Sequence, residues 1–153
     1  MPDMFSKKKR SEIMAAVRSN GNEATELKLC RTFRAHRIAG WRRHFMLAGN
    51  PDFVFPRERI AVFVDGCFWH GCKRHLRMPE GNRRYWQSKI ARNVERDRRT
   101  GRLLRKAGWR VLRVWEHSLR NTELVAGRFK SALRLSRRYA KMPLAKRVFW
   151  RKQ

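Results

Sequence analysis

The sequence predicts an α/β fold in which a mixed β-sheet is flanked by helices. A chain of 153 residues, 42% of them hydrophobic, can bury the core of one domain. The segment "IAVFVDG" (60–66) is apolar nearly throughout, which is typical of a central, buried strand. Amphipathic helical patterns lie on both sides of the β-rich segments. We expect one domain over residues 1–140 and a basic tail over residues 141–153.

Two helices are expected before the first strand. Ser11 can cap a short helix at roughly 11–19, and "GN" then separates it from a second helix at 23–37. The apolar residues of the second helix recur at helical spacing. That spacing places Cys30 in the core, where free cysteines are commonly buried.

Three strands are expected next, at 41–47, 52–55 and 60–66. The turns between them, "AGNP" and "PRER", are short. Strands joined by short turns pair in an antiparallel meander.

A helix, a strand and a last helix complete the pattern. The helix is expected at 82–107, broken or loosened near Gly101. The strand "GWRVLRVW" (108–115) follows it, and a basic helix covers 121–140. Because the strand at 108–115 comes after a helix, it can pair in parallel with an earlier strand.

The charge of the chain indicates its partner. Lys and Arg number 39 against 12 acidic residues, which gives a net charge of +27 and a pI near 11.8. Such an excess favours a polyanion, whose counterions are released on binding. A charge of about 2–8 would be enough for solubility alone. No apolar run reaches about 18 residues and no secretory signal is visible, so we expect a cytoplasmic, nucleoid-associated protein rather than a membrane protein.

The stretch "DGCFWHGCKRH" (65–75) collects residues that bind metals. Cys67, Cys72 and His75 form a C-x4-C-x2-H spacing. Thiolates and imidazoles in a tetrahedral set select zinc. A fourth ligand would be His117, at the end of the last strand, or the nearby His70. The alternative is that these residues are ordinary cysteines and scattered histidines with no metal.

Two carboxylates are expected at one end of the sheet. Asp52 begins one strand and Asp65 ends the next, so a hairpin brings them to the same edge. Oxygen ligands there suit Mg²⁺, which binds one or two carboxylates and substrate phosphates. Taken singly, each aspartate could instead stabilise the chain turn beside it. His70 follows closely and is a candidate general acid or base.

Aromatic rings are interleaved with basic residues in the same region. Such rings can unstack DNA as wedges or stack on exposed bases, but they can also be core residues. The rings are Phe68, Trp69, Tyr85 and Trp86, and the neighbouring cations include Lys73 and Arg74.

The segments "RSEIMAAVRS", "TEL", "PDFVF", "DGCFWHGC", "YWQSKIARNVERDRR" and "GWRVLRVWEH" occur in this order. Together they resemble the very short patch repair endonucleases, bacterial enzymes that nick one strand of DNA at a T:G mismatch. The resemblance covers about residues 8–120. It implies a fold like that of type II restriction endonucleases, a double-stranded DNA substrate and a monomeric enzyme.

The resemblance also implies roles for individual residues. Asp52 matches the aspartate that binds the catalytic Mg²⁺, and Val64 stands where a main-chain carbonyl binds the same ion. His70 matches the catalytic histidine, and Glu26 matches a glutamate near the water shell of the metal. The implied DNA contacts are Phe68, Trp69 and Trp86, which intercalate, and Met14 of an N-terminal helix at about 8–19, which enters the minor groove.

The chain departs from the family pattern at two places. Asp65 stands where the common pattern has histidine, and a carboxylate there could bind Mg²⁺ directly. The structural zinc set commonly has three cysteines and one histidine. Here the set would be Cys67, Cys72, His75 and His117. Two alternatives remain open: a nuclease of the same fold with another DNA target, and a non-catalytic zinc-containing nucleic-acid-binding protein.

Overall fold

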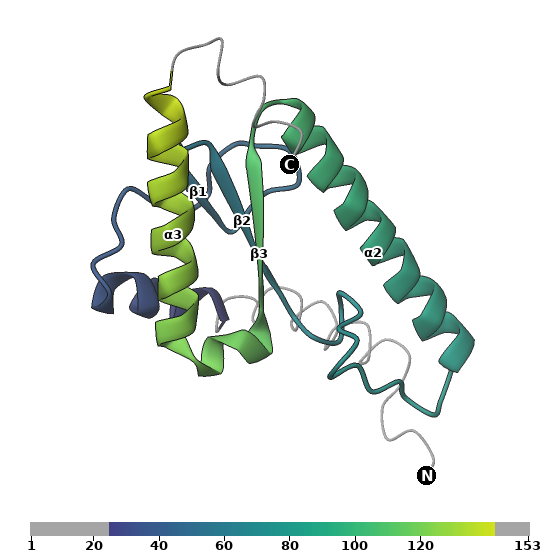
Figure 1. The fold of residues 1–153 in the computed structure, drawn as a ribbon. Helices are drawn as coiled ribbons and strands as arrows, with labels where there is room; N and C mark the ends of the chain where they lie inside the picture. The colour runs from purple at the N-terminus through teal and green to yellow at the C-terminus, as the bar shows by residue number, and fades with distance from the viewer. Residues whose placement is uncertain (1–24, 143–153) are drawn as a thin grey trace.

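The computed structural model describes residues 25–142, which form an α/β domain (Figure 1). A helix at residues 25–35 comes first. In chain order the further elements are β1 (Phe53–Phe55), β2 (Ile60–Asp65), α2 (Arg83–Lys106), β3 (Arg110–Trp115), the 3-10 helix η1 (Glu116–Arg120) and α3 (Thr122–Ala140).

The three strands form a mixed sheet in the order β1-β2-β3. β1 and β2 pair antiparallel through a tight turn, and β2 and β3 pair parallel. Every residue of β2 is buried, as its apolar sequence requires. The expected hairpin, central strand and parallel partner are therefore confirmed.

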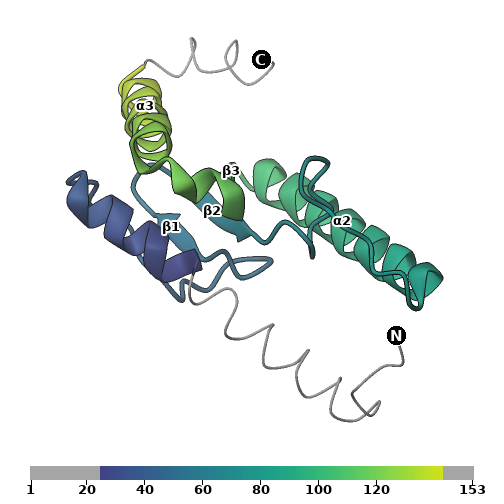
Figure 2. The ribbon, with the colours of Figure 1, turned by 90° about the horizontal axis from the view of Figure 1, so that it is seen from below.

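Helices cover both faces of the sheet. Figures 1 and 2 show α2 on one face, and α3 with the helix at 25–35 on the other. The larger core lies on the α3 side, where Phe33 of the helix at 25–35 packs edge-on against Phe53, Phe55 and Phe129. Cys30 lies in this core, as expected, and burial raises the pKa of its thiol. A smaller core lies on the α2 side, where Ala61, Phe63 and Leu104 meet.

Two expected features differ in the structure. The strand expected at 41–47 is reduced to one antiparallel bridge between Arg42 and Val54. His44 has a φ of 53°, a left-handed conformation that ends an extended segment. The helix α2 runs unbroken through Gly101, which is buried. Glycine costs a helix about 1 kcal/mol relative to alanine, and the packing of α2 on the sheet outweighs that cost.

Some expectations fall on residues that the structure does not describe. The helix at about 8–19, Met14 and residues 143–153 of the tail lie outside residues 25–142. Within the described range, no helix is both long and apolar enough to cross a bilayer.

Candidate active site and metal cluster

A cavity of about 360 Å³ lies at the C-terminal end of β2. The loop of residues 66–75, which holds Cys67, Cys72 and His75, follows this end of the strand. The cavity lies between the sheet, the turn before β1 and one face of α2. Its lining residues include Asn50, Asp52, Val64, Asp65, His70, Arg96, Asp97, Thr100 and Arg113. The sheet thus brings the two predicted carboxylates and the predicted histidine into one cavity.

Asp52 lies directly before β1, at the open end of the β1–β2 hairpin. Its Oδ2 accepts a hydrogen bond of 2.6 Å from the main-chain N–H of Val64. Burial raises the pKa of Asp52 to about 7. The hydrogen bond from Val64 opposes this rise, whereas the charge and hydrogen bond of Glu26 and the charge of Asp65 add to it. Carboxylates gathered in this way repel one another, and a cation between them would remove that repulsion.

Glu26 reaches this group from the helix at 25–35. Besides its hydrogen bond with Asp52, its Oε2 accepts a hydrogen bond of 2.5 Å from Nη2 of Arg43. The Nε of Arg43 is buried and has no hydrogen-bond partner within the described part of the chain. The structure thus places Glu26 next to Asp52, whereas its expected position near the water shell of a metal stays a prediction.

His70 points at α2. Its Nδ1 lies 2.5 Å from Oδ2 of Asp97 and 3.6 Å from Oδ1 of Asp65. Burial by itself would raise the pKa of Asp97, but the hydrogen bond and charge of His70, with the charges of Arg113 and Arg96, lower it overall. A carboxylate at Nδ1 fixes the orientation of the ring and leaves Nε2 to face other groups.

Asp65 is almost completely buried and is paired with Arg113 of β3. The Nη1 of Arg113 lies 2.7 Å from both carboxylate oxygens of Asp65 and 3.6 Å from Oδ2 of Asp97. The Arg113 guanidinium also lies over the ring of Phe63, at 4.9 Å from its centroid. Asp65 is thus at the predicted place, but its charge is already matched by a cation of the same chain.

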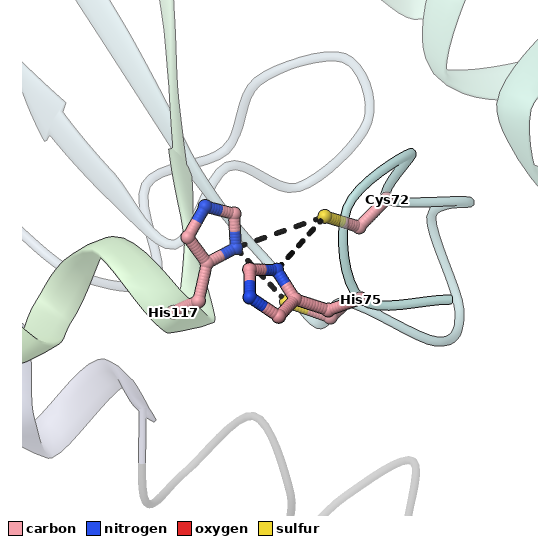
Figure 3. A group of neighbouring side chains, drawn as sticks. Cys72, His75 and His117 are labelled. Atoms are coloured by element: carbon pink, nitrogen blue, oxygen red, sulfur yellow. Dashed lines mark hydrogen bonds between the residues drawn. The ribbon is translucent and has the colours of Figure 1, made fainter. Parts of the chain in front are cut away.

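The cysteine–histidine group forms a compact cluster. The ligand atoms of Cys67, Cys72, His75 and His117 all lie within 4.8 Å of one another. His117 comes from the start of η1, whereas Cys67, Cys72 and His75 come from the loop after β2. Figure 3 shows His117 facing Cys72 and His75. The structure therefore groups His117, the expected fourth member, with the three loop residues.

The spacing inside the cluster suits a metal. The Nδ1 of His117 lies 3.2 Å from Sγ of Cys67 and 3.7 Å from Sγ of Cys72, and the Nδ1 of His75 lies 3.6 Å from Sγ of Cys72. Zinc bonds of about 2.3 Å to sulfur and about 2.0 Å to nitrogen place tetrahedral S and N ligands about 3.5 Å apart. Partial burial and the nearby His75 lower the pKa of His117, which favours the neutral imidazole that binds metals.

The predicted aromatic residues form one group, with Trp86 at its centre. The Trp86 ring centroid lies 5.5 Å from that of Phe68, 6.1 Å from that of Trp69 and 5.1 Å from that of Tyr85. Trp86 is buried, Phe68 and Trp69 are half-buried, and Tyr85 is exposed. The group therefore combines the two alternatives: a packed ring at the centre and accessible rings around it. The adjacent Lys73 and Arg74 are exposed.

The sequence analysis missed Asp97 and Arg113, the two cavity residues that contact His70 and Asp65 most closely. Asp97 lies in "NVERDRR", where two acidic residues, Glu95 and Asp97, stand among basic ones and could have been noticed. Arg113 interrupts the apolar strand "RVLRVW". Only the parallel register, which pairs Arg113 with Phe63, places it beside Asp65.

Comparisons with known proteins identify the class of enzyme. The family model described as DNA mismatch endonuclease Vsr matches residues 2–76. The DNA mismatch endonuclease Vsr of Escherichia coli (strain K12) is 39% identical over 124 residues, which cover 80% of this chain and 79% of that protein. The type II nicking enzyme V.NmeDIP of Neisseria meningitidis serogroup C is 36% identical over 135 residues, covering 86% and 90%.

A shorter match is closer in sequence. The type II nicking enzyme V.NaeI of Lentzea aerocolonigenes is 60% identical over 68 residues, which are 44% of this chain and 41% of that protein. The relatives share one class, and the chain is accordingly a DNA endonuclease. From its identity with the Escherichia coli enzyme over four-fifths of both chains, it belongs to the Vsr family of DNA mismatch endonucleases.

Proposed function

We propose that this endonuclease nicks one strand of duplex DNA next to a T:G mismatch and so starts a short patch repair. The observation that carries the proposal is the position of the cavity. Carboxylates and a histidine line it, and His70 belongs to the same loop as Phe68, Trp69 and the exposed cations Lys73 and Arg74. DNA that binds to this loop would bring its backbone to the carboxylates.

The catalytic ion is proposed to be Mg²⁺, held by Asp52 and the main-chain carbonyl of Val64. Its support is the raised pKa of Asp52, which results from burial beside other carboxylates, as expected at a site for a cation. Such an ion, when bound, polarises the scissile phosphate and stabilises its developing charge. Asp65 was expected as a further ligand, but both of its carboxylate oxygens are already bound by Arg113.

His70 is proposed to transfer a proton during hydrolysis. Because Asp97 occupies Nδ1, the Nε2 atom is the one available to accept a proton from water or to give one to a leaving oxygen. Glu26, beside Asp52, is proposed to orient the attacking water. Asp97 acts through His70, so it is a positioning residue.

The cluster of Cys67, Cys72, His75 and His117 is proposed to hold a structural Zn²⁺. Four protein ligands fill a tetrahedral site and leave no open position for chemistry. The support is the match between the cluster spacing and tetrahedral zinc. The ion would tie the loop to the end of β3, which keeps His70 and the rings in one arrangement.

The aromatic group is proposed to open the base stack at the mismatch. Unstacking is least costly where pairing is already weak. Phe68 and Trp69 are half-buried, and Tyr85 is exposed, so their edges are accessible to DNA. Trp86 would support the other rings from its buried position, with a contact to DNA only if the group rearranges. Met14 is proposed to enter the minor groove.

A nicking assay tests the proposal directly. Linear duplexes that carry one T:G mismatch, or a matched T:A pair at the same position, are incubated with the enzyme and Mg²⁺. The Asp52→Ala and His70→Ala variants are compared with the wild type. We expect nicking of the T:G strand and losses of at least about 10²-fold in both variants. Arg137→Gln, which changes an exposed residue paired with Glu58 at the opposite end of β2, is the control and should retain activity.

The outcomes separate the alternatives. Equal nicking of matched and mismatched duplexes would show a nuclease with another target. Binding of DNA without any nicking would show a non-catalytic DNA-binding protein. Full activity of Asp52→Ala would refute the assignment of the site.

A further inference from the structure

Arg113 sits in the catalytic cavity in an arrangement that leaves part of its guanidinium open. Its side chain is 27% exposed and lines the same cavity as Asp52 and His70. A structural arginine–carboxylate pair usually uses two nitrogens in a fork. Here both oxygens of Asp65 contact the single nitrogen Nη1. Within residues 25–142, Nη2 and Nε of Arg113 have no hydrogen-bond partner.

The position of the guanidinium is fixed on three sides. Asp65, whose side chain is only 3% exposed, holds Nη1 from the end of β2, and Asp97 of α2 lies 3.6 Å from the same nitrogen. The Phe63 ring supports the guanidinium from the sheet. A guanidinium bound in this way is pre-organised, and its free nitrogens match the geometry of phosphate oxygens.

The same contact makes Asp65 a poor metal ligand. Each of its oxygens is 2.7 Å from Nη1, so a cation that approached either oxygen would meet a positive charge at hydrogen-bond distance. The third carboxylate of the cavity, Asp97, is likewise engaged, by His70. Within residues 25–142, the oxygens of Asp52 have no such cation beside them, and their partners are the N–H of Val64 and the Glu26 carboxyl group.

We propose that Arg113, held in place by Asp65, binds a non-bridging oxygen of the DNA phosphate at the cleavage site and stabilises its negative charge. Asp65 is then a positioning residue for Arg113 and not a ligand of Mg²⁺. This inference rests on the proposed function of the cavity. It assigns to this chain a basic phosphate contact formed by a pair of residues from neighbouring strands, Asp65 of β2 and Arg113 of β3.

The test compares Arg113→Gln, Asp65→Asn and the double variant, with Arg137→Gln as the control. Single-turnover nicking and the Mg²⁺ concentration for half-maximal rate are measured on a T:G duplex. The affinity for the same duplex is measured without divalent cations over a range of salt concentrations. This second readout does not depend on the metal or on catalysis.

Arg113→Gln should lower the nicking rate by about 10²–10³-fold, as loss of a donor to a transition-state anion does. It should also reduce the slope of log affinity against log salt by about 1, because one phosphate contact is lost. Asp65→Asn should lower the rate while its half-maximal Mg²⁺ concentration stays within about threefold of the wild type. The double variant should be no slower than Arg113→Gln, because the two residues act as one unit.

Two results would overturn the inference. One is an Arg113→Gln enzyme that nicks and binds like the wild type. The other is an Asp65→Asn enzyme that needs at least about tenfold more Mg²⁺, as the loss of a metal ligand would cause. If Arg113→Gln does not fold, as judged by circular dichroism, Arg113→Lys takes its place: it keeps the charge, and an unchanged rate would refute the need for a guanidinium. If wild type does not nick, or Asp52→Ala nicks equally well, it is the proposed function that fails.

Discussion

Asp52 should destabilise the metal-free protein at neutral pH, and Asp52→Asn should therefore stabilise it. The pKa of Asp52 is raised from 3.8 to about 7, chiefly by burial and secondarily by Glu26 and Asp65. The folded protein thus holds a proton that the unfolded chain releases. Stability is consequently lost as the pH rises from about 4 to about 7, and it is constant above that range. Three pKa units at 1.36 kcal/mol each give an upper limit of about 4 kcal/mol.

Asparagine removes this cost and can keep the hydrogen bond. Its Oδ1 can still accept from the N–H of Val64, and it cannot become charged. We expect a gain of about 2–4 kcal/mol at pH 8, which corresponds to roughly 5–15 °C in Tm for a domain of this size. Thermal unfolding is followed at pH 5 and pH 8 in Mg²⁺-free buffer with stoichiometric zinc, and the gain should be much smaller at pH 5.

Two controls make the measurement decisive. Glu80→Gln removes one exposed negative charge and should change Tm little at either pH. Addition of Mg²⁺ at pH 8 should raise the Tm of the wild type, because a ligand of the folded state stabilises it, and should have little effect on Asp52→Asn. If Asp52→Asn is no more stable than the wild type at pH 8, then Asp52 is not buried at an energetic cost and the electrostatic account of the site is wrong.

Three further predictions concern the surroundings of the site. His117→Ala should lose the single zinc ion that we expect in the wild type, measured by metal analysis of the purified protein, and its Tm should fall; retention of zinc would exclude this cluster as the site. Asp97→Asn should lower nicking by at least about 10²-fold with unchanged DNA affinity. Because the pKa of Asp97 is lowered, the stability it contributes is present above the ordinary carboxyl range and is lost as the pH falls through its folded pKa, so the difference in Tm between this variant and wild type should vanish in acid. Gly71→Ala should lower the free energy of unfolding in urea by about 1–3 kcal/mol, because Gly71 has a φ of +66° and a Cβ would lie 3.2 Å from Ile90. Gly81→Ala, the control, has open space around it and should lower that free energy far less.

The composition and local patterns of the chain were enough to predict most of its elements. The apolar run of β2 predicted a central strand, and short turns predicted an antiparallel partner, because these features depend on neighbouring residues alone. The strand expected at 41–47 was wrong, since the left-handed conformation of His44 is not visible in its β-like pattern. The helix through Gly101 was wrongly expected to loosen, since tertiary packing decided its continuity.

The sequence by itself also determined the chemistry of the two candidate sites. The spacing of Cys67, Cys72 and His75, and the placing of Asp52 and Asp65 at the ends of paired strands, follow from residues close together in the chain. The tertiary structure alone decided how those groups are used. Arg113 contacts Asp65 only because of the parallel register of β3 on β2. Asp97 contacts His70 only because of the orientation in which α2 packs on the sheet. The hydrophobic periodicity of a segment predicts which face of a helix or strand a side chain occupies. Its partner on the neighbouring element depends on strand register and helix packing, which residues distant in the sequence determine.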